Sequence, residues 1–246
     1  EDYEDIYLNV FKALNFIELN DFDAAFVEIR RINHKLNMLE DKYKSMADQY
    51  NQSEDKGANF EIGKSQFHNC ALGRYLSMLL YRTERRFDDA NIDLQKIKEA
   101  WQLQKHIYDF SRADLSDALS ATDKAKINIV SFIGNGPEKK ANTLYIHTEQ
   151  NQIIIASTKE NPRNKQDLTD FDVIYWPGVS EGYHFKLQLP YMEKKGSDIT
   201  KIKVYIDDRY KGELERIESL ENVAFETYKI KEPIIYLKTI TRTIAK

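Results

Sequence analysis

The sequence contains very little cysteine, and this limits the kinds of protein that it can encode. A single cysteine, Cys70, stands among 246 residues, in the stretch HNCALGRYL. One thiol excludes an intrachain disulfide framework, and a zinc site would need histidine and carboxylate ligands alone. Because free cysteine is among the most frequently buried residue types, we expect Cys70 to lie in the core.

Long apolar runs and an excess of basic residues are also missing. No stretch approaches the roughly 20 apolar residues that a transmembrane helix needs. Residues 1–125 hold 17 Lys/Arg against 23 Asp/Glu and carry −6, while the rest of the chain carries +2. A nucleic-acid partner is not expected, because neutralising phosphates requires a basic surface. The chain starts at Glu1 without a signal peptide, and a signal upstream of it stays open.

Recognisable catalytic motifs are absent as well. FIGNGPEKK resembles a phosphate-binding loop, but Pro137 removes an amide donor and a strand is expected after it, so we predict a turn. No G-x-S-x-G motif occurs, and no two histidines are spaced i, i+4. The sequence therefore predicts no enzyme, no metal and no cofactor. A pair of catalytic carboxylates distant in sequence stays open, because 40 acidic residues offer many pairs.

A repeated phrase is the most informative feature of the first half. NDFDAAFVEIRRI (20–32) and RRFDDANIDLQKI (85–97) lie 65 residues apart. Around each phrase, residues of one stripe advance by alternating steps of three and four, which predicts one long amphipathic helix per copy. The first stripe is Phe22, Ala25, Ile29, Ile32, Leu36, Leu39, Tyr43, Met46 and Tyr50. The second stripe is Phe87, Ala90, Leu94, Ile97, Trp101, Gln104 and Tyr108, in which Gln104 is the polar exception.

Each phrase follows a polar turn, ELND or TERR, with another amphipathic segment before it, so the predicted unit is a helical hairpin. Ala25 and Ala90 stand where the second helix must pass close to the first, and only a small side chain allows that approach. Phe22 and Phe87 are expected to close the ends of the hairpins. An aromatic residue, two further residues and an alanine after a tight turn resemble tetratricopeptide repeats, although the closing proline is missing.

These patterns predict an α-helical first domain over residues 1–125. Its hairpins cover about residues 3–50 and 66–108, with an irregular insert at 46–66 between them. One more short helix is expected over 111–125. The second helix of the first hairpin is unusually long for a repeat of this kind.

The second half, residues 126–246, has the pattern of a small antiparallel β domain. Its segments are short, rich in Ile, Val and Tyr, and separated by turn residues. TLYIHTEQNQIIIAS and KVYIDDRYKGELERI are predicted hairpins, and INIVSFI is a predicted strand. The chain ends in a sequence that is helical in pattern on both sides of a break near Pro233. The predicted fold class is α+β, with tetratricopeptide-like hairpins first and the β domain and closing helices second.

The order of these segments resembles a family of bacterial cell-envelope lipoproteins. The resemblance is carried by YLNVFKALNFIELNDFDAAFVEIRRINHKL, then the second hairpin, INIVSFIGNGPEKK, LPYMEKK and LENVAFETYKIKEPIIYLKTITRTIAK. It implies export to the periplasm or outer membrane and a lipid on a cysteine upstream of Glu1. The family has no established biochemical role, so the resemblance implies location more than activity.

Two sets of residues are candidates for binding. If the hairpins form a groove lined by their first helices, the groove-facing residues are Tyr7 and Glu18 in the first copy and Tyr75 and Arg82 in the second. In the second half, YWPGVSEGYHF has the composition of an aromatic lip, with Tyr175 and Trp176 as the binding candidates.

The preferred interpretation is a non-catalytic, envelope-anchored protein that binds a peptide or protein through the helical groove. One alternative is an envelope enzyme that acts on glycan or peptide through the β domain. Another is a structural subunit whose long stripe, residues 22–50, pairs with a second copy, so a homo-oligomer stays open.

Overall fold

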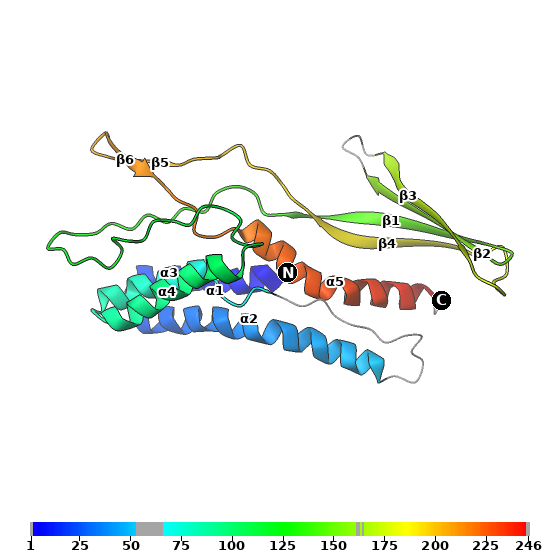
Figure 1. Ribbon diagram of the computed structural model, residues 1–246, viewed down its shortest axis with the longest axis horizontal. Coiled ribbons are helices and arrows are strands. Elements are labelled where there is room, and N and C mark those ends of the chain that lie inside the picture. Colours follow the sequence, from blue (N-terminus) through cyan, green and yellow to red (C-terminus); the bar gives the residue numbers. More distant parts are fainter. Residues whose placement is uncertain (1, 53–65, 161–162, 164, 245–246) are drawn as a thin grey trace.

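The computed structural model describes residues 2–52, 66–160, 163 and 165–244, and it confirms the α+β fold class (Figure 1). Four helices come first, then six strands, then one helix. The helices are α1 (Asp2–Glu18), α2 (Phe22–Asn51), α3 (Ala71–Thr83), α4 (Phe87–Leu103) and α5 (Leu220–Ile244). The strands are β1 (Glu138–Glu149), β2 (Gln152–Glu160), β3 (Gln166–Tyr175), β4 (His184–Glu193), β5 (Lys203–Ile206) and β6 (Arg209–Glu213).

The two predicted hairpins are confirmed, and their turns have the same hydrogen bonds. Asn20 and Arg85 both adopt a positive φ, 55° and 62°. In each turn, one amide donates a hydrogen bond to the carbonyl five residues before it, and the preceding amide donates to the carbonyl three residues before it. This pair of hydrogen bonds is a Schellman motif. The amides of Asp21 and Asn20 donate to the carbonyls of Phe16 and Ile17, and those of Arg86 and Arg85 donate to the carbonyls of Tyr81 and Arg82. The repeated phrase therefore encodes a repeated turn.

Most of the predicted stripe lies in the core. Ala25 and Ala90 are fully buried where the helices of each hairpin meet. Phe87, however, is 45% exposed, so the expectation that it closes its hairpin is wrong. The second helix is also shorter than the stripe, because α4 ends at Leu103. Gln104 is polar for a structural reason: its Oε1 accepts from the amide of His68 (2.7 Å), at the entry to α3.

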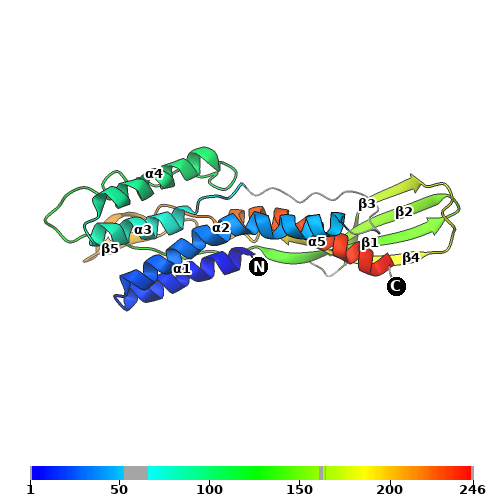
Figure 2. The same cartoon turned by 90° about the horizontal axis from the view of Figure 1, so that it is seen from below.

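The C-terminal helix joins the helical and β parts of the molecule. It contacts α1, α2 and β4, and Figures 1 and 2 show it lying between α2 and the sheet. Ile230 and Ile234 of α5 form a buried cluster with Leu39 and Tyr43 of α2. The C-terminal half of α2 is therefore covered by α5 of the same chain. The division into domains at residue 125 stays a prediction.

Three local predictions are wrong. Helix α5 continues through Pro233, because packing of Ile230 and Ile234 on both sides of the proline holds the segment helical. Residues 111–125 are irregular, with a turn at residues 116–119 instead of a helix, and the Ala118 carbonyl accepts from Arg82 instead of from a helical amide. INIVSFI forms no strand, and Phe132 packs its ring against Phe11 of α1 at 4.9 Å.

The main sheet is antiparallel, with strand order β3-β2-β1-β4. Both predicted hairpins, β1–β2 and β5–β6, are confirmed. At one end of the sheet Leu187 and Leu189 of β4 are buried, and the hydroxyl of Tyr228 on α5 donates to the Pro190 carbonyl (2.6 Å). The other end, with the β3–β4 connection, projects beyond the C-terminal end of α5 (Figures 1 and 2).

Candidate interaction surface on the four-stranded sheet

The strand register assigns the side chains of the sheet to two faces. Tyr145 of β1 lies opposite Ala156 of β2, and Ala156 lies opposite Phe171 of β3, so these three side chains share a face. We call this the outer face. It carries Tyr145, His147, Ile154, Ala156, Phe171, Val173, Tyr175, His184 and Lys186. Leu187 and Leu189 belong to the opposite face, which packs towards α5.

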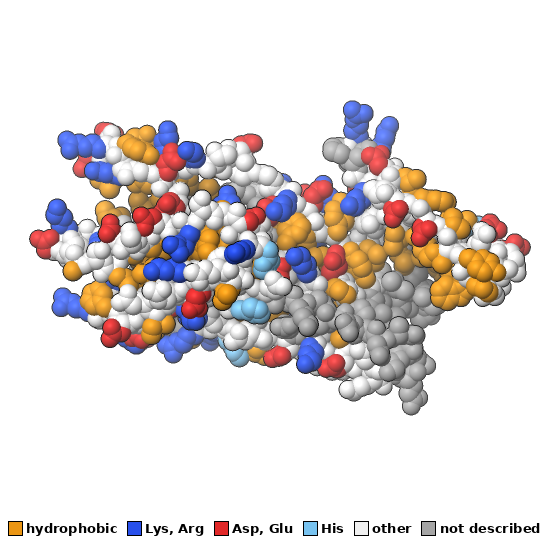
Figure 3. Space-filling model, viewed as in Figure 1, with side chains coloured by type: hydrophobic (Ala, Val, Ile, Leu, Met, Phe, Trp, Pro, Cys, Tyr) orange, Lys and Arg blue, Asp and Glu red, His pale blue; other side chains and the backbone are white. Residues whose placement is uncertain are grey.

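The apolar side chains of the outer face are open to solvent. Phe171 is 58% exposed, Val173 46% and Tyr145 39%. Figure 3 shows hydrophobic side chains gathered at this end of the molecule. A contiguous apolar surface of this kind is uncommon on a soluble protein unless it contacts another molecule.

An aromatic group continues this surface at the end of the sheet. Tyr175 is 71% exposed, Trp176 59% and Tyr183 57%. Asn151, in the β1–β2 turn, holds this end in place. Its carbonyl accepts from the Trp176 amide (2.9 Å), and its side-chain oxygen accepts from the Gly178 amide (2.8 Å). The two turns at this end are therefore bonded to each other, which fixes the aromatic residues relative to the outer face.

A histidine pair lies beside the apolar residues. His147 and His184 are cross-strand neighbours whose rings stack at a centroid distance of 4.3 Å, and their Nδ1 atoms are 3.0 Å apart. The other ring nitrogen of His147 lies 2.7 Å from a Glu149 carboxylate oxygen. Within the described part of the chain, no group of three or more His, Cys, Asp or Glu side chains is arranged to hold a metal ion.

Two outward amides of the edge strand β3 are covered by side chains of the same strand. The register places the amides of Phe171 and Val173 on the free edge, away from β2. Asp170 Oδ1 accepts from the Phe171 amide (2.9 Å), and Asp172 Oδ1 accepts from the Val173 amide (2.8 Å). Because these carboxylates occupy the donors that another strand would use, they hinder pairing at this edge.

The surface around the outer face is acidic. Residues 144–156 and 170–186 contain four carboxylates and one lysine: Glu149, Asp170, Asp172 and Glu181, and Lys186. Asp170 and Asp172 alternate with Phe171 and Val173 and therefore belong to the opposite face, but their bonds to the outward amides keep them at the free edge of β3. A partner that extends over this edge would meet two carboxylates, which favours basic groups on that partner.

Among the predicted binding residues, Tyr175 and Trp176 lie together at the exposed end of the sheet. The groove candidates lie elsewhere. Tyr7 is 2% exposed, so its expected place on an open groove is wrong; it lies in the core with Cys70 and Val223. This side of α1 is covered by residues around the starts of α3 and α5.

The other groove candidates do not meet on one open surface. Glu18 is exposed at the end of α1, whereas Tyr75 is half-buried. Arg82 is also half-buried, and it binds the segment after α4 by donating to the Ala118 carbonyl (2.8 Å). A binding role for Glu18, Tyr75 and Arg82 stays a prediction.

A cluster of titratable groups lies in the core, where α3 and α5 begin. Cys70 is fully buried, as predicted. Glu218 Oε2 accepts from the Leu72 amide (3.1 Å), the Tyr108 hydroxyl (3.1 Å) and the Cys70 thiol (3.4 Å). Its Oε1 atom is buried and has no hydrogen-bond partner among the residues that the structure describes. Burial raises the pKa of Glu218 to about 7, against the opposing effect of these bonds. Burial, reinforced by the Glu218 charge, raises the pKa of Cys70 and Tyr108 far above their usual ranges.

Sequence reasoning missed Tyr145, Phe171 and Val173. The signal was present in DFDVIY, where Phe171 and Val173 alternate with two aspartates. Alternation shows that one face differs from the other, but it does not show which face the rest of the chain covers.

Comparisons with protein-family models, with curated proteins and with solved structures find no match for this chain. No helix in the described residues combines the length and apolarity needed to cross a membrane.

Proposed function

We propose that this protein is a non-catalytic interaction protein that binds a protein or peptide partner on the outer face and aromatic end of its sheet. The observation that carries this proposal is the exposure of Tyr145, Phe171, Val173, Tyr175 and Trp176 on one end of a fixed sheet. Tyrosine and tryptophan supply much of the binding energy at protein interfaces, because they bury a large area with few rotatable bonds.

The partner surface should be apolar at its centre and basic at its rim. Apolar side chains would cover Phe171 and Val173, and lysine or arginine would lie near Asp170 and Asp172. Those two carboxylates form no ion pair with the described residues, so a basic partner would not have to displace an existing one. The helical body serves as the support, because α5 fixes the other end of the sheet to α1 and α2.

We also propose that the protein acts at a bacterial cell envelope. This proposal rests on the sequence resemblance to envelope lipoproteins and on no contact in the structure. Fractionation of the source cells, with antibody detection of the full-length protein in the membrane fraction, tests it separately. Recovery in the cytosolic fraction alone would contradict it.

Site-specific photocrosslinking in the source cells tests the binding surface. A photoreactive amino acid replaces Val173 in one variant and Leu103 in a control. Leu103 is 76% exposed at the end of α4, a helix that lies apart from the four-stranded sheet (Figure 2). We expect a discrete crosslinked species from position 173, none from position 103, and loss of the first when Tyr175→Ala and Trp176→Ala are added.

The same experiment distinguishes the other functions. A crosslink from position 173 only to a second copy of this chain would favour the self-associating subunit. Equal crosslinking from both positions, or from position 103 alone, would contradict binding on the outer face.

A further inference from the structure

The apolar side chains of the outer face form a row along the edge strand β3. Phe171, Val173 and Tyr175 alternate along this strand and share the outer face. Strict alternation would put Leu168 on the opposite face, but a register shift in the β2–β3 pairing adds one residue to β3. This bulge places Leu168 opposite Thr158, on the outer face, where Leu168 is 64% exposed. The bulge therefore extends the row to four exposed apolar side chains.

The length of this row defines the size of a segment that could cover it. Tyr175 follows Leu168 by seven positions, one of which is the bulge, so roughly six strand steps of about 3.3 Å separate the two. The row is therefore about 20 Å long. An α-helix rises about 1.5 Å per residue, so about 13 residues of helix, nearly four turns, would span it.

Both edges of the sheet contain positions at which an added strand cannot pair. On β3, Asp170 and Asp172 occupy two outward amides. On the other edge, Pro190 of β4 has no amide, and its carbonyl accepts from the Tyr228 hydroxyl of α5 (2.6 Å). A partner is therefore expected to use the outer face. An α-helix can cover the face of a sheet without pairing with either edge.

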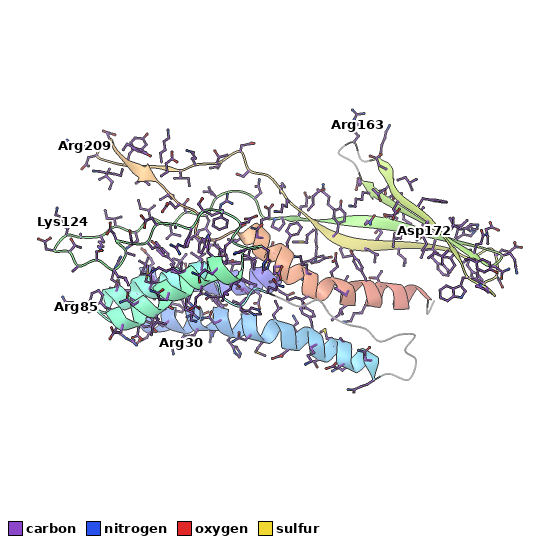
Figure 4. All side chains as sticks on the ribbon, in the orientation of Figure 1. Arg30, Arg85, Lys124, Arg163, Asp172 and Arg209 are labelled. Atoms are coloured by element: carbon purple, nitrogen blue, oxygen red, sulfur yellow. The ribbon has the colours of Figure 1, made fainter. Side chains whose placement is uncertain are left out.

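The charges beside the row favour a basic partner. Asp170 and Asp172 lie at the free edge next to the row, and neither forms an ion pair with the described residues. Figure 4 shows Asp172 on the sheet, far from Arg30 and Arg85 of the helical body. A second copy of this chain would bring the same carboxylates to the contact, where like charges repel. Lysine or arginine on a different partner would be attracted to them.

We propose that the partner segment bound on the outer face is a basic amphipathic α-helix of about four turns that lies along β3. Its apolar stripe covers Leu168, Phe171 and Val173, and its lysine or arginine side chains reach over the free edge to Asp170 and Asp172. This inference rests on the proposed function, and it adds the conformation and the charge of the segment that binds.

Photocrosslinking from the two ends of the row, with the full-length protein in its source cells, tests the helix. Benzoylphenylalanine replaces Leu168 in one variant and Tyr175 in another, and mass spectrometry identifies the partner residue that each captures. We expect both captured residues to lie in one basic segment of one partner, about 13 residues apart. An extended segment would place them about six residues apart instead.

Asp170→Asn/Asp172→Asn, added to each crosslinking variant, tests the charge. Asparagine keeps a side-chain oxygen that can accept from the outward amides, so the edge stays covered while two negative charges are removed. We expect the crosslink yield to fall about threefold or more, because two exposed ion pairs with the partner are lost. Asp123→Asn/Asp198→Asn is the matched control and should keep the yield. Lys124, next to Asp123, lies at the opposite end of the molecule from Asp172 (Figure 4).

The outcomes distinguish this inference from the proposed function. No captured partner from positions 168, 173 and 175 would contradict both. Captured residues about six positions apart, or in two unrelated segments, would leave binding on the outer face in place and overturn the helix. Capture of only a second copy of this chain would overturn it as well. An unchanged yield in Asp170→Asn/Asp172→Asn would overturn the pairing with basic residues.

Discussion

At the scale of single residues, the buried Glu218 carboxyl links four segments of the chain. It accepts from the start of α3 and from Tyr108 after α4, and it lies two residues before the start of α5. Tyr7 of α1 lies close enough for the Glu218 charge to raise its pKa further, although burial is the larger cause. A group at this junction affects the packing of both hairpins and of α5.

The stability of the fold should therefore depend on the ionisation of Glu218. Folding raises the pKa of this carboxyl from 4.5 to about 7, so the folded protein holds the proton more tightly than the unfolded chain does. The resulting contribution is complete below about pH 4.5 and is lost as the pH rises through about 7. Its size is on the order of 3 kcal/mol, since each unit of pKa corresponds to about 1.4 kcal/mol.

Glu218→Gln should remove this dependence, because glutamine keeps the shape of the side chain without its titration. The free energy of unfolding, measured by urea denaturation between pH 4.5 and 8, should fall less steeply for the variant than for the wild type. The advantage of the variant should grow towards pH 8. Parallel curves for the two proteins would contradict the assigned role of Glu218.

At the scale of elements, β3 combines an apolar surface with an edge that resists pairing. Phe171 and Val173 expose their side chains, while Asp170 and Asp172 occupy their outward amides. A partner can therefore cover the face of the sheet without a second strand joining its edge. The two aspartates therefore hinder aggregation through the edge of β3 and leave the face of the sheet free to bind a partner.

Removing the carboxylates of Asp170 and Asp172 should allow another strand to pair with the free edge of β3. Asp170→Ala/Asp172→Ala frees two amide donors and removes two negative charges, so β3 should pair with β3 of another molecule. Sedimentation velocity should show concentration-dependent association in this variant. Asp123→Ala/Asp198→Ala removes the same charge from exposed loops and serves as the control. Association of both variants would implicate net charge instead, and association of neither would show that the edge needs no such protection.

The elements that sequence patterns predicted best are those specified by local sequence. The turns at Asn20 and Arg85 and the hairpin β1–β2 depend on residues close in the chain, and all were predicted. The errors depend on distant contacts. Tyr7 is buried by segments more than 60 residues away, and Pro233 lies within a helix because α2 and the sheet pack around α5. The exposure of Tyr175 and Trp176 fitted the predicted lip, but the outer face could not be assigned before the position of α5 was known.

At the scale of the whole molecule, α5 makes the helices and the sheet depend on each other. Its Ile230 is fully buried against Leu39 and Tyr43 of α2, and its Tyr228 binds the backbone of β4. A sequence boundary near residue 125 separates the two kinds of secondary structure, yet this helix from the second part completes the core of the first. The outer face is therefore held in place by contacts on the opposite side of the sheet.

Ile230→Ala tests this dependence. Truncating a fully buried isoleucine leaves a cavity and should lower the free energy of unfolding by about 2–5 kcal/mol. Because α5 serves both parts, hydrogen exchange should accelerate in the amides of α2 and of β1 and β4 together. Val204→Ala, in the small β5–β6 hairpin, is the control and should leave exchange in α2 and β1 unchanged. Acceleration confined to α2 would show that the sheet keeps its structure without this contact, and the helical part would then be a separate folding unit rather than the support of the binding surface.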